Sequence, residues 1–195
     1  MEQLLSLFNM IAPFSADLEG HMRDLLTKPR LLSKKEILLH EGDTSKYIYF
    51  IEKGLVRSYF DLYGQEKTMW IMKEMDLVVS VISFFSQVKS FETVEAMEDC
   101  ILWGISYHQL LYIYKNFPEF HVHRAVLLEK YYILSEQRNY IRMQKASLRY
   151  KELLENDPAL ISRIPNKYLA SYLGIAEETL SRLRSRHWNH THNGH

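Results

Sequence analysis

Apolar positions along the first 28 residues recur at the spacing of an α-helix. Leu18, Met22, Leu25 and Leu26 follow one another at short helical intervals, which places them on one side of a helix. Ser15, just before this run, is a residue type that accepts hydrogen bonds from the free N–H groups at a helix start. The pattern predicts helical structure over residues 1–28, with a helix beginning after Ser15.

The pattern changes between Leu31 and Ile105. Short runs rich in Ile, Val, Tyr and Phe are separated there by the turn-forming segments "EGDTSK", "EKG", "LYGQEK" and "MEDC". Strands that follow one another at such short intervals are typical of small antiparallel barrels and jelly rolls. We therefore expect an antiparallel β-roll over this region.

A long segment without glycine or proline runs from Glu119 to Asp157. Asn116 is a suitable N-cap, Pro118 would stand in the first turn, and Glu119 has the spacing of a capping box. These residues predict a helix that begins at Asn116 and continues to about Lys145.

Two apolar stripes follow this predicted helix. The first contains Phe120, Leu127, Tyr131, Leu134 and Ile141, and the second contains Val122, Val126, Ile133 and Tyr140. A helix with two apolar faces has two surfaces to pack against. Either both faces are buried in one core, or one lies on the strands and the other on a second subunit.

The segment "KYLASYLGIAEETLSRLRSR" predicts two short helices joined at Gly174. Leu169, Ala170 and Leu173 form the inner side of the first helix, and Gly174 suits the left-handed conformation that ends it. Ile175 fills the corner, and the second helix turns Leu180 and Leu183 inward. A small residue, a glycine four positions later and paired apolar positions are the pattern of a helix-turn-helix.

The outer face of the second helix has the chemistry of a DNA-reading surface. Arg182 can bond in a bidentate manner to guanine, and Glu178 can accept a hydrogen bond from cytosine. The residues that we expect at the DNA backbone are Lys167, Glu177, Thr179, Ser181, Arg184 and Arg186. The alternative is a solvated helical hairpin in which Glu178 and Arg182 form a surface ion pair.

Charge and cysteine content narrow the choice of partners. The chain has 195 residues and a net charge of zero, but residues 141–195 hold 9 Lys/Arg against 5 Asp/Glu. A basic C-terminal part favours an anionic partner there.

Cys100 is the only cysteine, which excludes a four-thiolate iron–sulfur cluster within one chain. No signal-peptide pattern and no apolar run of about 20 residues occurs, so we expect a cytoplasmic protein without a membrane partner.

The chain resembles the Crp/Fnr transcription regulators. "HEGDTSKYIYFIEKGLVRSYF" is similar to their β-roll, the helix after Asn116 to their dimerisation helix, and "LGIAEETLSRLRSR" to their recognition helix. The resemblance implies an α+β fold with three parts. These are a jelly-roll-like sensor domain over residues 1–115, a dimerisation helix over 116–145, and a helix-turn-helix domain of winged-helix-like type over 146–195. It also implies a homodimer through residues 116–145, with double-stranded DNA and RNA polymerase as partners.

One part of the family pattern is missing. Members that bind cyclic nucleotides carry a Gly-Glu pair and an Arg-Ser or Arg-Thr pair around the cyclic phosphate. The aligned positions here hold Val79 with Ser80 and Ser90 with Phe91, and Lys89 is the nearest cation. A buried phosphate needs a cationic partner, preferably a guanidinium. We therefore expect an effector pocket at these five residues that does not bind cyclic AMP.

Two other function classes were compared with a DNA-binding regulator. A ligand-sensing module that acts on a protein partner would keep the roll but bind no DNA. A cupin-type metalloenzyme would need several histidines on the strands, whereas residues 31–105 contain only His40. No arrangement of nucleophile and base is present, so we predict that the protein has no enzymatic activity, no resident cofactor and no metal.

Overall fold

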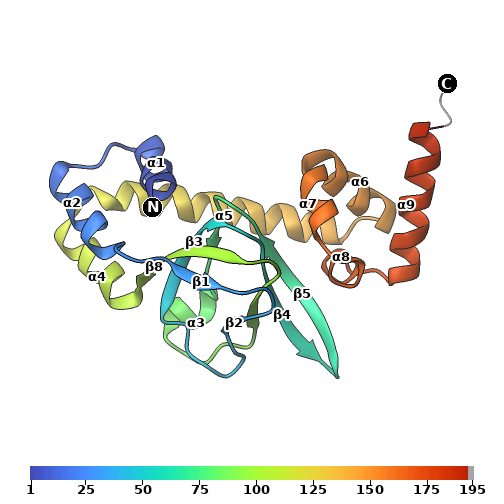
Figure 1. Cartoon of the computed structure of the whole chain (residues 1–195), viewed down its shortest axis with the longest axis horizontal. Helices are drawn as coiled ribbons and strands as arrows, with labels where there is room; N and C mark the ends of the chain where they lie inside the picture. Colours follow the sequence, from blue (N-terminus) through green and yellow to red (C-terminus); the bar gives the residue numbers. More distant parts are fainter. Residues whose placement is uncertain (193–195) are drawn as a thin grey trace.

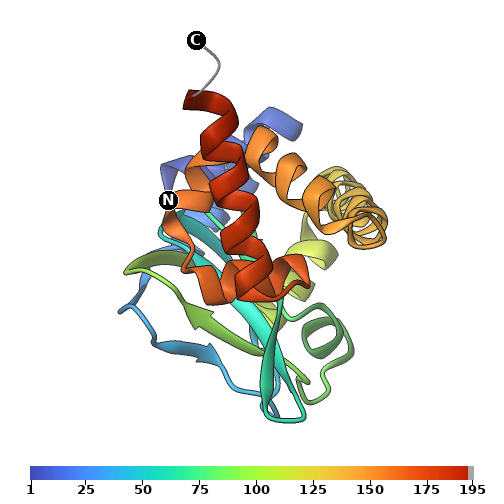
Figure 2. The same ribbon diagram turned by 90° about the vertical axis from the view of Figure 1, so that its right-hand side faces the viewer.

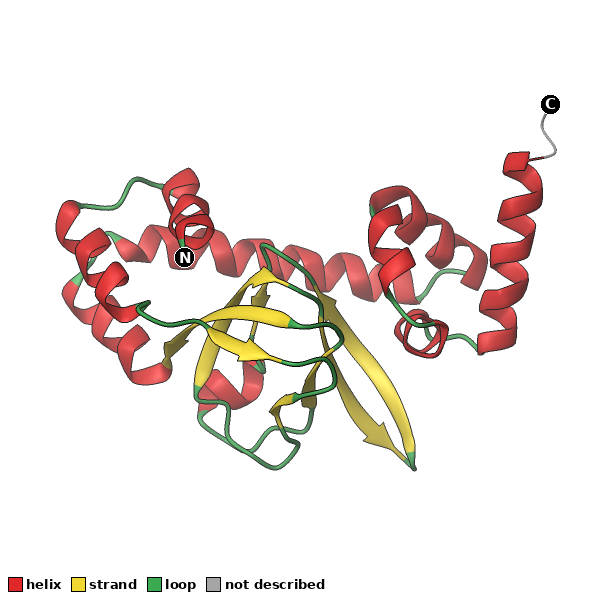
Figure 3. Cartoon of the chain, viewed as in Figure 1, coloured by secondary structure: helices red, strands yellow, loops and turns green. Residues whose placement is uncertain are grey.

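The computed structural model describes residues 1–192, and their side chains as far as residue 186. In Figure 1, α5 (Phe120–Arg142) runs along the length of the molecule, with the strands packed below it. One end of α5 carries the helices α1 (Glu2–Ile11), α2 (Ala16–Leu25) and α4 (Tyr107–Asn116). The other end carries the four helices of residues 146–192. Figure 3 shows that the strands occupy only the middle of this arrangement.

The N-terminal helices confirm the start that the sequence predicted. The Ser15 hydroxyl accepts a hydrogen bond from the Leu18 N–H at 3.2 Å, and α2 begins at the next residue. Leu18 and Met22 are fully buried in a cluster that also contains Phe8 and Phe120. The apolar stripe of α2 therefore packs α1 and α2 against α5.

The strand region folds into two antiparallel four-stranded sheets, which confirms the predicted roll. The strand order is β1-β8-β3-β6 in one sheet and β2-β7-β4-β5 in the other. Buried residues from both sheets, among them Ile51, Val56, Val94 and Leu102, form a shared core. The strands and the short helix within the roll are β1 (Arg30–Leu32), β2 (Ile37–Leu39), β3 (Tyr47–Lys53), β4 (Val56–Leu62), β5 (Gln65–Met72), β6 (Leu77–Val78), α3 (Val81–Ser86), β7 (Thr93–Ala96) and β8 (Cys100–Ser106).

Gly54 forms the turn between β3 and β4, as its place in "EKG" predicted. Its φ angle is 105°, and a Cβ at this position would lie 2.5 Å from Cys100 Sγ. Both the backbone conformation and the close approach exclude a larger residue. The Gly54 N–H donates to Glu74 Oε1 at 2.9 Å, so the turn is also held to the end of β5.

The predicted cap of the long helix is wrong. Asn116 is the last residue of α4, and its amide donates to Tyr112 O at 2.8 Å. Glu119 makes no capping hydrogen bond and instead accepts one from the Ser15 hydroxyl at 2.7 Å. The reason is that α4, which starts at a Ser106–Gln109 capping box, continues as far as Asn116. The Asn116 side chain is therefore used at the end of a helix.

The C-terminal part is helical throughout the described residues. It consists of α6 (Ala146–Asn156), α7 (Pro158–Arg163), α8 (Asn166–Leu173) and α9 (Glu177–His192). No strand follows β8 in this part of the chain, so the described residues include no β-wing beside the helix-turn-helix. The side chains of the histidine-rich end, from His187 onward, lie outside the described residues.

Membrane-spanning helices and metal-binding clusters are both absent from the described residues. None of the described helices is long and apolar enough to cross a membrane. In the same residues no group of three or more His, Cys, Asp or Glu side chains is placed to hold a metal ion. His123 is buried in an aromatic cluster, with its Nε2 atom 2.9 Å from Ala12 O.

Candidate nucleic-acid interface and effector cavity

The corner between α8 and α9 has the geometry that the sequence predicted. Gly174 ends α8 with φ 63° and ψ 41°, the left-handed conformation that favours glycine. Beyond it, the Ile175 N–H donates to Ala170 O at 3.0 Å. Leu169, Ala170, Leu173 and Leu180 are buried in one cluster, so the two helices are closely packed. Figure 2 shows α9 on the surface of this end of the molecule.

The outer face of α9 makes no side-chain hydrogen bond to another helix or strand among the described residues. Glu178, Ser181, Arg182, Ser185 and Arg186 are all exposed. Arg182 makes only long hydrogen bonds to its own helix, from Nε to Glu178 O and from Nη2 to Thr179 Oγ1, both at 3.3 Å. No ion pair joins the side chains of Glu178 and Arg182 in the described structure, so the alternative surface pair is not formed. Both side chains are available to another molecule.

The expected DNA-backbone residues fall into two groups. Lys167, Glu177, Ser181 and Arg186 are exposed, and Thr179 is half-buried. Arg184 is half-buried too, and its guanidinium donates to Asn166 Oδ1 and, at 3.3 Å, to Ile161 O. Arg184 thus fastens α9 to the start of α8 and to α7, a structural role that the sequence pattern did not indicate.

The expected phosphate positions are occupied by two serines bonded to each other. Ser80 Oγ and Ser90 Oγ lie 3.1 Å apart, and both residues are buried. Ser90 Oγ also donates to Glu92 O at 2.7 Å. Neither hydroxyl is hydrogen-bonded to a lysine or arginine of the described structure. Lys89, the nearest cation in the sequence, is exposed and is not among the lining residues of the two cavities described next.

Two cavities adjoin the remaining expected pocket residues. The first, called here the apolar cavity, has a volume of about 480 Å³ and lies between the roll and α5, with Phe50, Trp70, Trp103, Leu127 and Tyr131 among its walls. Val79 and Phe91 also line it. The second, of about 610 Å³, is bounded by β1, β2, β3 and the segment between β2 and β3, and includes Val79 and Ser80.

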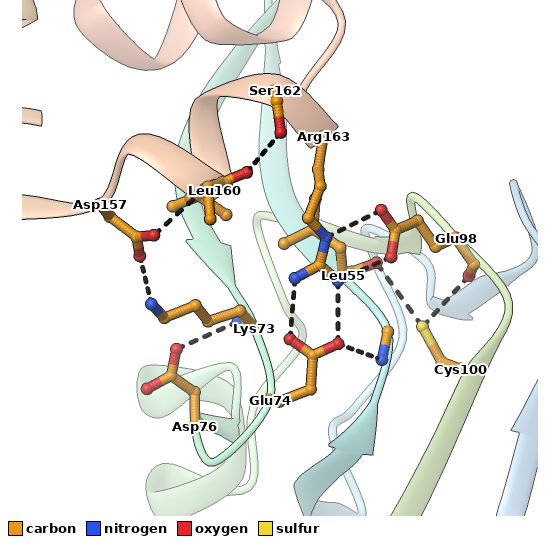
Figure 4. Close-up of polar contacts among 12 residues, drawn as sticks. Leu55, Lys73, Glu74, Asp76, Glu98, Cys100, Asp157, Leu160, Ser162 and Arg163 are labelled. Carbon is orange, nitrogen blue, oxygen red and sulfur yellow. Dashed lines mark hydrogen bonds and ion pairs between the residues drawn. The ribbon is translucent and has the colours of Figure 1, made fainter. Parts of the chain in front are cut away.

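Helix α7 is docked on the roll by ion pairs (Figure 4). The Arg163 guanidinium contacts both oxygens of Glu74, at 2.8 and 2.9 Å, and both oxygens of Glu98, at 2.7 and 3.0 Å. Lys73 pairs with Asp157 at the start of the same helix. Hydrogen bonds from Arg163 lower the pKa of Glu74 to about 2. The C-terminal helices are therefore attached to the β-roll through charged side chains.

Arg57 provides a second attachment, which the sequence analysis missed. It is 1% exposed, and its guanidinium donates to Glu95 at 2.6 Å and to Glu66 at 2.7 Å. Burial acts to lower the pKa of Arg57, but these carboxylates raise it overall. The ring of Tyr168 on α8 lies 3.8 Å from the guanidinium carbon and that of Tyr59 lies 4.0 Å from it. The only signal in the sequence is a charged residue directly between the apolar Leu55–Val56 pair and the rest of β4.

Arg138 connects the long helix α5 to the β-roll and to α8. Its guanidinium carbon lies 4.3 Å from the ring of Trp70 on β5 and 5.1 Å from that of Tyr172 on α8. Burial lowers the pKa of Arg138 to about 10. In the sequence, Arg138 lies between Leu134 and Ile141 of the first apolar stripe, and its position between two aromatic rings depends on the tertiary structure.

Acid is expected to weaken the docking of α7. Because the pKa of Glu74 is about 2 in the folded protein and 4.5 in a model peptide, its contribution to stability is complete above about pH 4.5 and is lost as the pH falls toward 2. Urea unfolding midpoints between pH 6 and 2.5 would measure this loss. A Glu74→Gln variant should have a lower midpoint at pH 6 and a smaller decrease in acid. Identical pH profiles for the variant and the wild type would contradict the expectation.

Comparisons with known proteins agree with this architecture. Residues 29–117, from β1 to the end of α4, match the family model of the cyclic nucleotide-binding domain. No curated protein sequence matches the chain. FixK2 from Bradyrhizobium japonicum superposes with a TM-score of 0.69 at 22% identity, over 85% of each chain. A CooA mutant from Carboxydothermus hydrogenoformans gives 0.64 at 21% identity, over 84% of this chain and 78% of its own.

A third structure extends the agreement. CLP of Xanthomonas campestris, described as a c-di-GMP responsive global regulator, superposes with a TM-score of 0.67 at 15% identity, over 89% of this chain and 93% of its own. At such identities the likeness concerns the fold alone. The resemblance seen in the sequence is thereby confirmed at the level of the fold: residues 29–117 match the model of the cyclic nucleotide-binding domain, and the chain shares its overall fold with these regulator structures.

Proposed function

We propose that the protein is a homodimeric, sequence-specific DNA-binding regulator of transcription of Crp/Fnr type, acting in the cytoplasm without enzymatic activity. The observation that carries the proposal is the α8–α9 hairpin. Its inner residues are packed around Gly174, while Glu178 and Arg182 stand exposed on the outer face of α9. A helix that presents a guanidinium and a carboxylate in this way suits the edges of bases in a major groove.

A dimer formed through α5 accounts for a second exposed surface. Val122, Val126, Ile133 and Tyr140 are between 41% and 64% exposed, although all are apolar or aromatic. They recur along one side of the helix, as the residues of a two-helix seam do. In the proposed dimer this stripe packs against the same stripe of the partner, and two recognition helices enter successive major grooves about 34 Å apart. RNA polymerase is the further partner that we propose for such a regulator.

The effector of this regulator is proposed not to be cyclic AMP. A phosphate anion at the aligned positions would displace the hydrogen bond between Ser80 and Ser90 and would meet two neutral hydroxyls. The desolvation of a charged group without a cation is costly. Arg30, which lines the neighbouring second cavity, is paired with Glu36 at 3.1 Å.

Selection of bound fragments from the organism's own genomic DNA tests the proposal. We expect the purified full-length protein to enrich fragments that share a near-palindromic site, and to bind that site far more tightly than shuffled duplexes. Cyclic AMP should show no binding in calorimetry at micromolar concentrations. Equal, weak binding to every duplex, with and without cell metabolites, would instead favour a sensor module that acts on a protein partner.

A further inference from the structure

We propose that the apolar cavity between the roll and α5 binds a small, neutral, mostly apolar molecule that carries a hydrogen-bond donor. Its volume of about 480 Å³ is that of a site for a small organic ligand. The walls are formed by aromatic and aliphatic side chains, including Phe50, Trp70, Trp103 and Leu127. Such walls favour a ligand whose surface is mainly apolar.

Two buried polar groups at the cavity define the polar end of the ligand. Ser58 is 4% exposed, and its Oγ atom has no hydrogen-bond partner in the described structure. Glu92 is 6% exposed, and no hydrogen bond to its carboxylate is formed by the described residues. Both residues line the cavity. A buried polar atom without a partner, such as Ser58 Oγ, is costly. The Glu92 carboxylate, which lies near enough to Arg138 to act on the pKa of that side chain, can only accept a hydrogen bond, so the matching group on the ligand is a donor.

The charges around the cavity disfavour an anionic ligand. Glu92 would repel a negative group in the interior. Arg124 also lines the cavity, but it is exposed and lies 4.8 Å from the ring of Tyr114. Arg138 touches the wall residue Trp70 without lining the cavity itself. A neutral molecule avoids the cost of desolvating a charge in an apolar site.

The strands that line the cavity also hold the DNA-reading hairpin. In β4, Ser58 pairs with Trp70 and Val94, and all three line the cavity. The preceding residue, Arg57, points to the opposite side of the sheet and meets Tyr168 of α8. A ligand against Ser58 and Trp70 would therefore be one sheet thickness from α8. An effect of the bound ligand on DNA binding through α8 rests on the proposed function, whereas ligand binding itself does not.

A matched pair of fluorescent probes tests the ligand class on the full-length protein. N-phenyl-1-naphthylamine is neutral, apolar and carries one N–H donor. 1-Anilinonaphthalene-8-sulfonate has the same ring skeleton with an added sulfonate. We expect saturable binding of the neutral probe, one per chain, at least tenfold tighter than that of the sulfonate. Absence of saturable binding, or tighter binding of the sulfonate, overturns the proposal.

A Ser58→Ala variant tests the position of the donor. We expect its affinity for N-phenyl-1-naphthylamine to fall about fivefold, because a hydrogen bond contributes roughly 1 kcal/mol. Its thermal midpoint should be unchanged or higher, since the hydroxyl that is removed has no partner in the protein. Ser162→Ala, on the exposed side of α7, is the control and should bind as the wild type does.

Two results would overturn the assignment of the cavity. Equal probe affinity of Ser58→Ala and the wild type would mean that the probe binds elsewhere. An affinity that falls as the protein concentration is raised would mean that a second copy of the chain occupies the cavity. Failure of the protein to bind DNA would leave these measurements unchanged, so the two proposals fail separately.

Discussion

An Arg57→Ala variant is expected to lose about 3–5 kcal/mol of its free energy of unfolding, the usual cost of removing one partner of a buried ion pair. The change leaves Glu95, whose side chain is only 11% exposed, without its cation. It also removes the guanidinium between Tyr59 and Tyr168. Glu66 is 35% exposed and can be rehydrated, so most of the loss comes from Glu95. Equilibrium urea unfolding followed by circular dichroism measures the effect.

The exposed Arg23 provides a matched control. It too contacts two carboxylates, those of Glu2 and Glu19, but its side chain is 41% exposed. Arg23→Ala should therefore destabilise the protein far less than Arg57→Ala, because water screens an exposed ion pair. A double variant, Arg57→Met with Glu95→Gln, should recover part of the loss because no buried charge remains unpaired. Equal effects of Arg57→Ala and Arg23→Ala would contradict the role assigned to the buried pair.

The Arg57→Ala variant should also loosen the α8–α9 hairpin. Tyr168 belongs to α8, so loss of its stacking partner weakens the attachment of α8 to β4. Amide hydrogen exchange of residues 166–173 should become faster in the variant, and faster than in Arg23→Ala. Unchanged exchange would mean that the ion pairs of α7 hold the hairpin without help from Arg57.

Arg182→Ala is expected to weaken binding to the selected DNA site by about 1–3 kcal/mol, roughly fivefold to 150-fold. Arg182 is exposed and its hydrogen bonds to its own helix are long, so little in the free protein competes with a base. The variant should discriminate less between bases at one position of the site, whereas its affinity for shuffled DNA should change little. Fluorescence anisotropy with labelled duplexes, one base pair varied at a time, gives the required comparison.

Arg186→Ala is the control on the same helix. Arg186 is exposed at the edge of the reading face, where we expect it to contact phosphate. Its loss should weaken binding to all duplexes by a similar factor and reduce the slope of affinity against salt by about one. A loss with Arg182→Ala that is the same on selected and shuffled DNA would show that Arg182 is only a backbone contact.

Local spacing was sufficient for much of the fold. The cap at Ser15, the turn at Gly54 and the corner at Gly174 each depend on one residue and its near neighbours, and all three are confirmed. The start of α5 was wrong for a related reason. Asn116 and Glu119 had capping-box spacing, but that spacing does not reveal that α4 already uses Asn116.

The sequence by itself determined the succession of helices, strands and hairpin, because backbone propensities and apolar periodicity act over a few residues. It also determined which face of α9 is exposed, since the rotation of a helix is regular. Only the tertiary structure decided which charges meet. Arg57 meets Glu95, Arg138 meets Tyr172 and Arg163 meets Glu74, each 30 or more positions away along the chain. Such contacts arise from packing that no local pattern contains. The same packing leaves the apolar stripe of Val122, Val126, Ile133 and Tyr140 on the surface. It also encloses the apolar cavity and leaves Ser58 Oγ without a partner beside it.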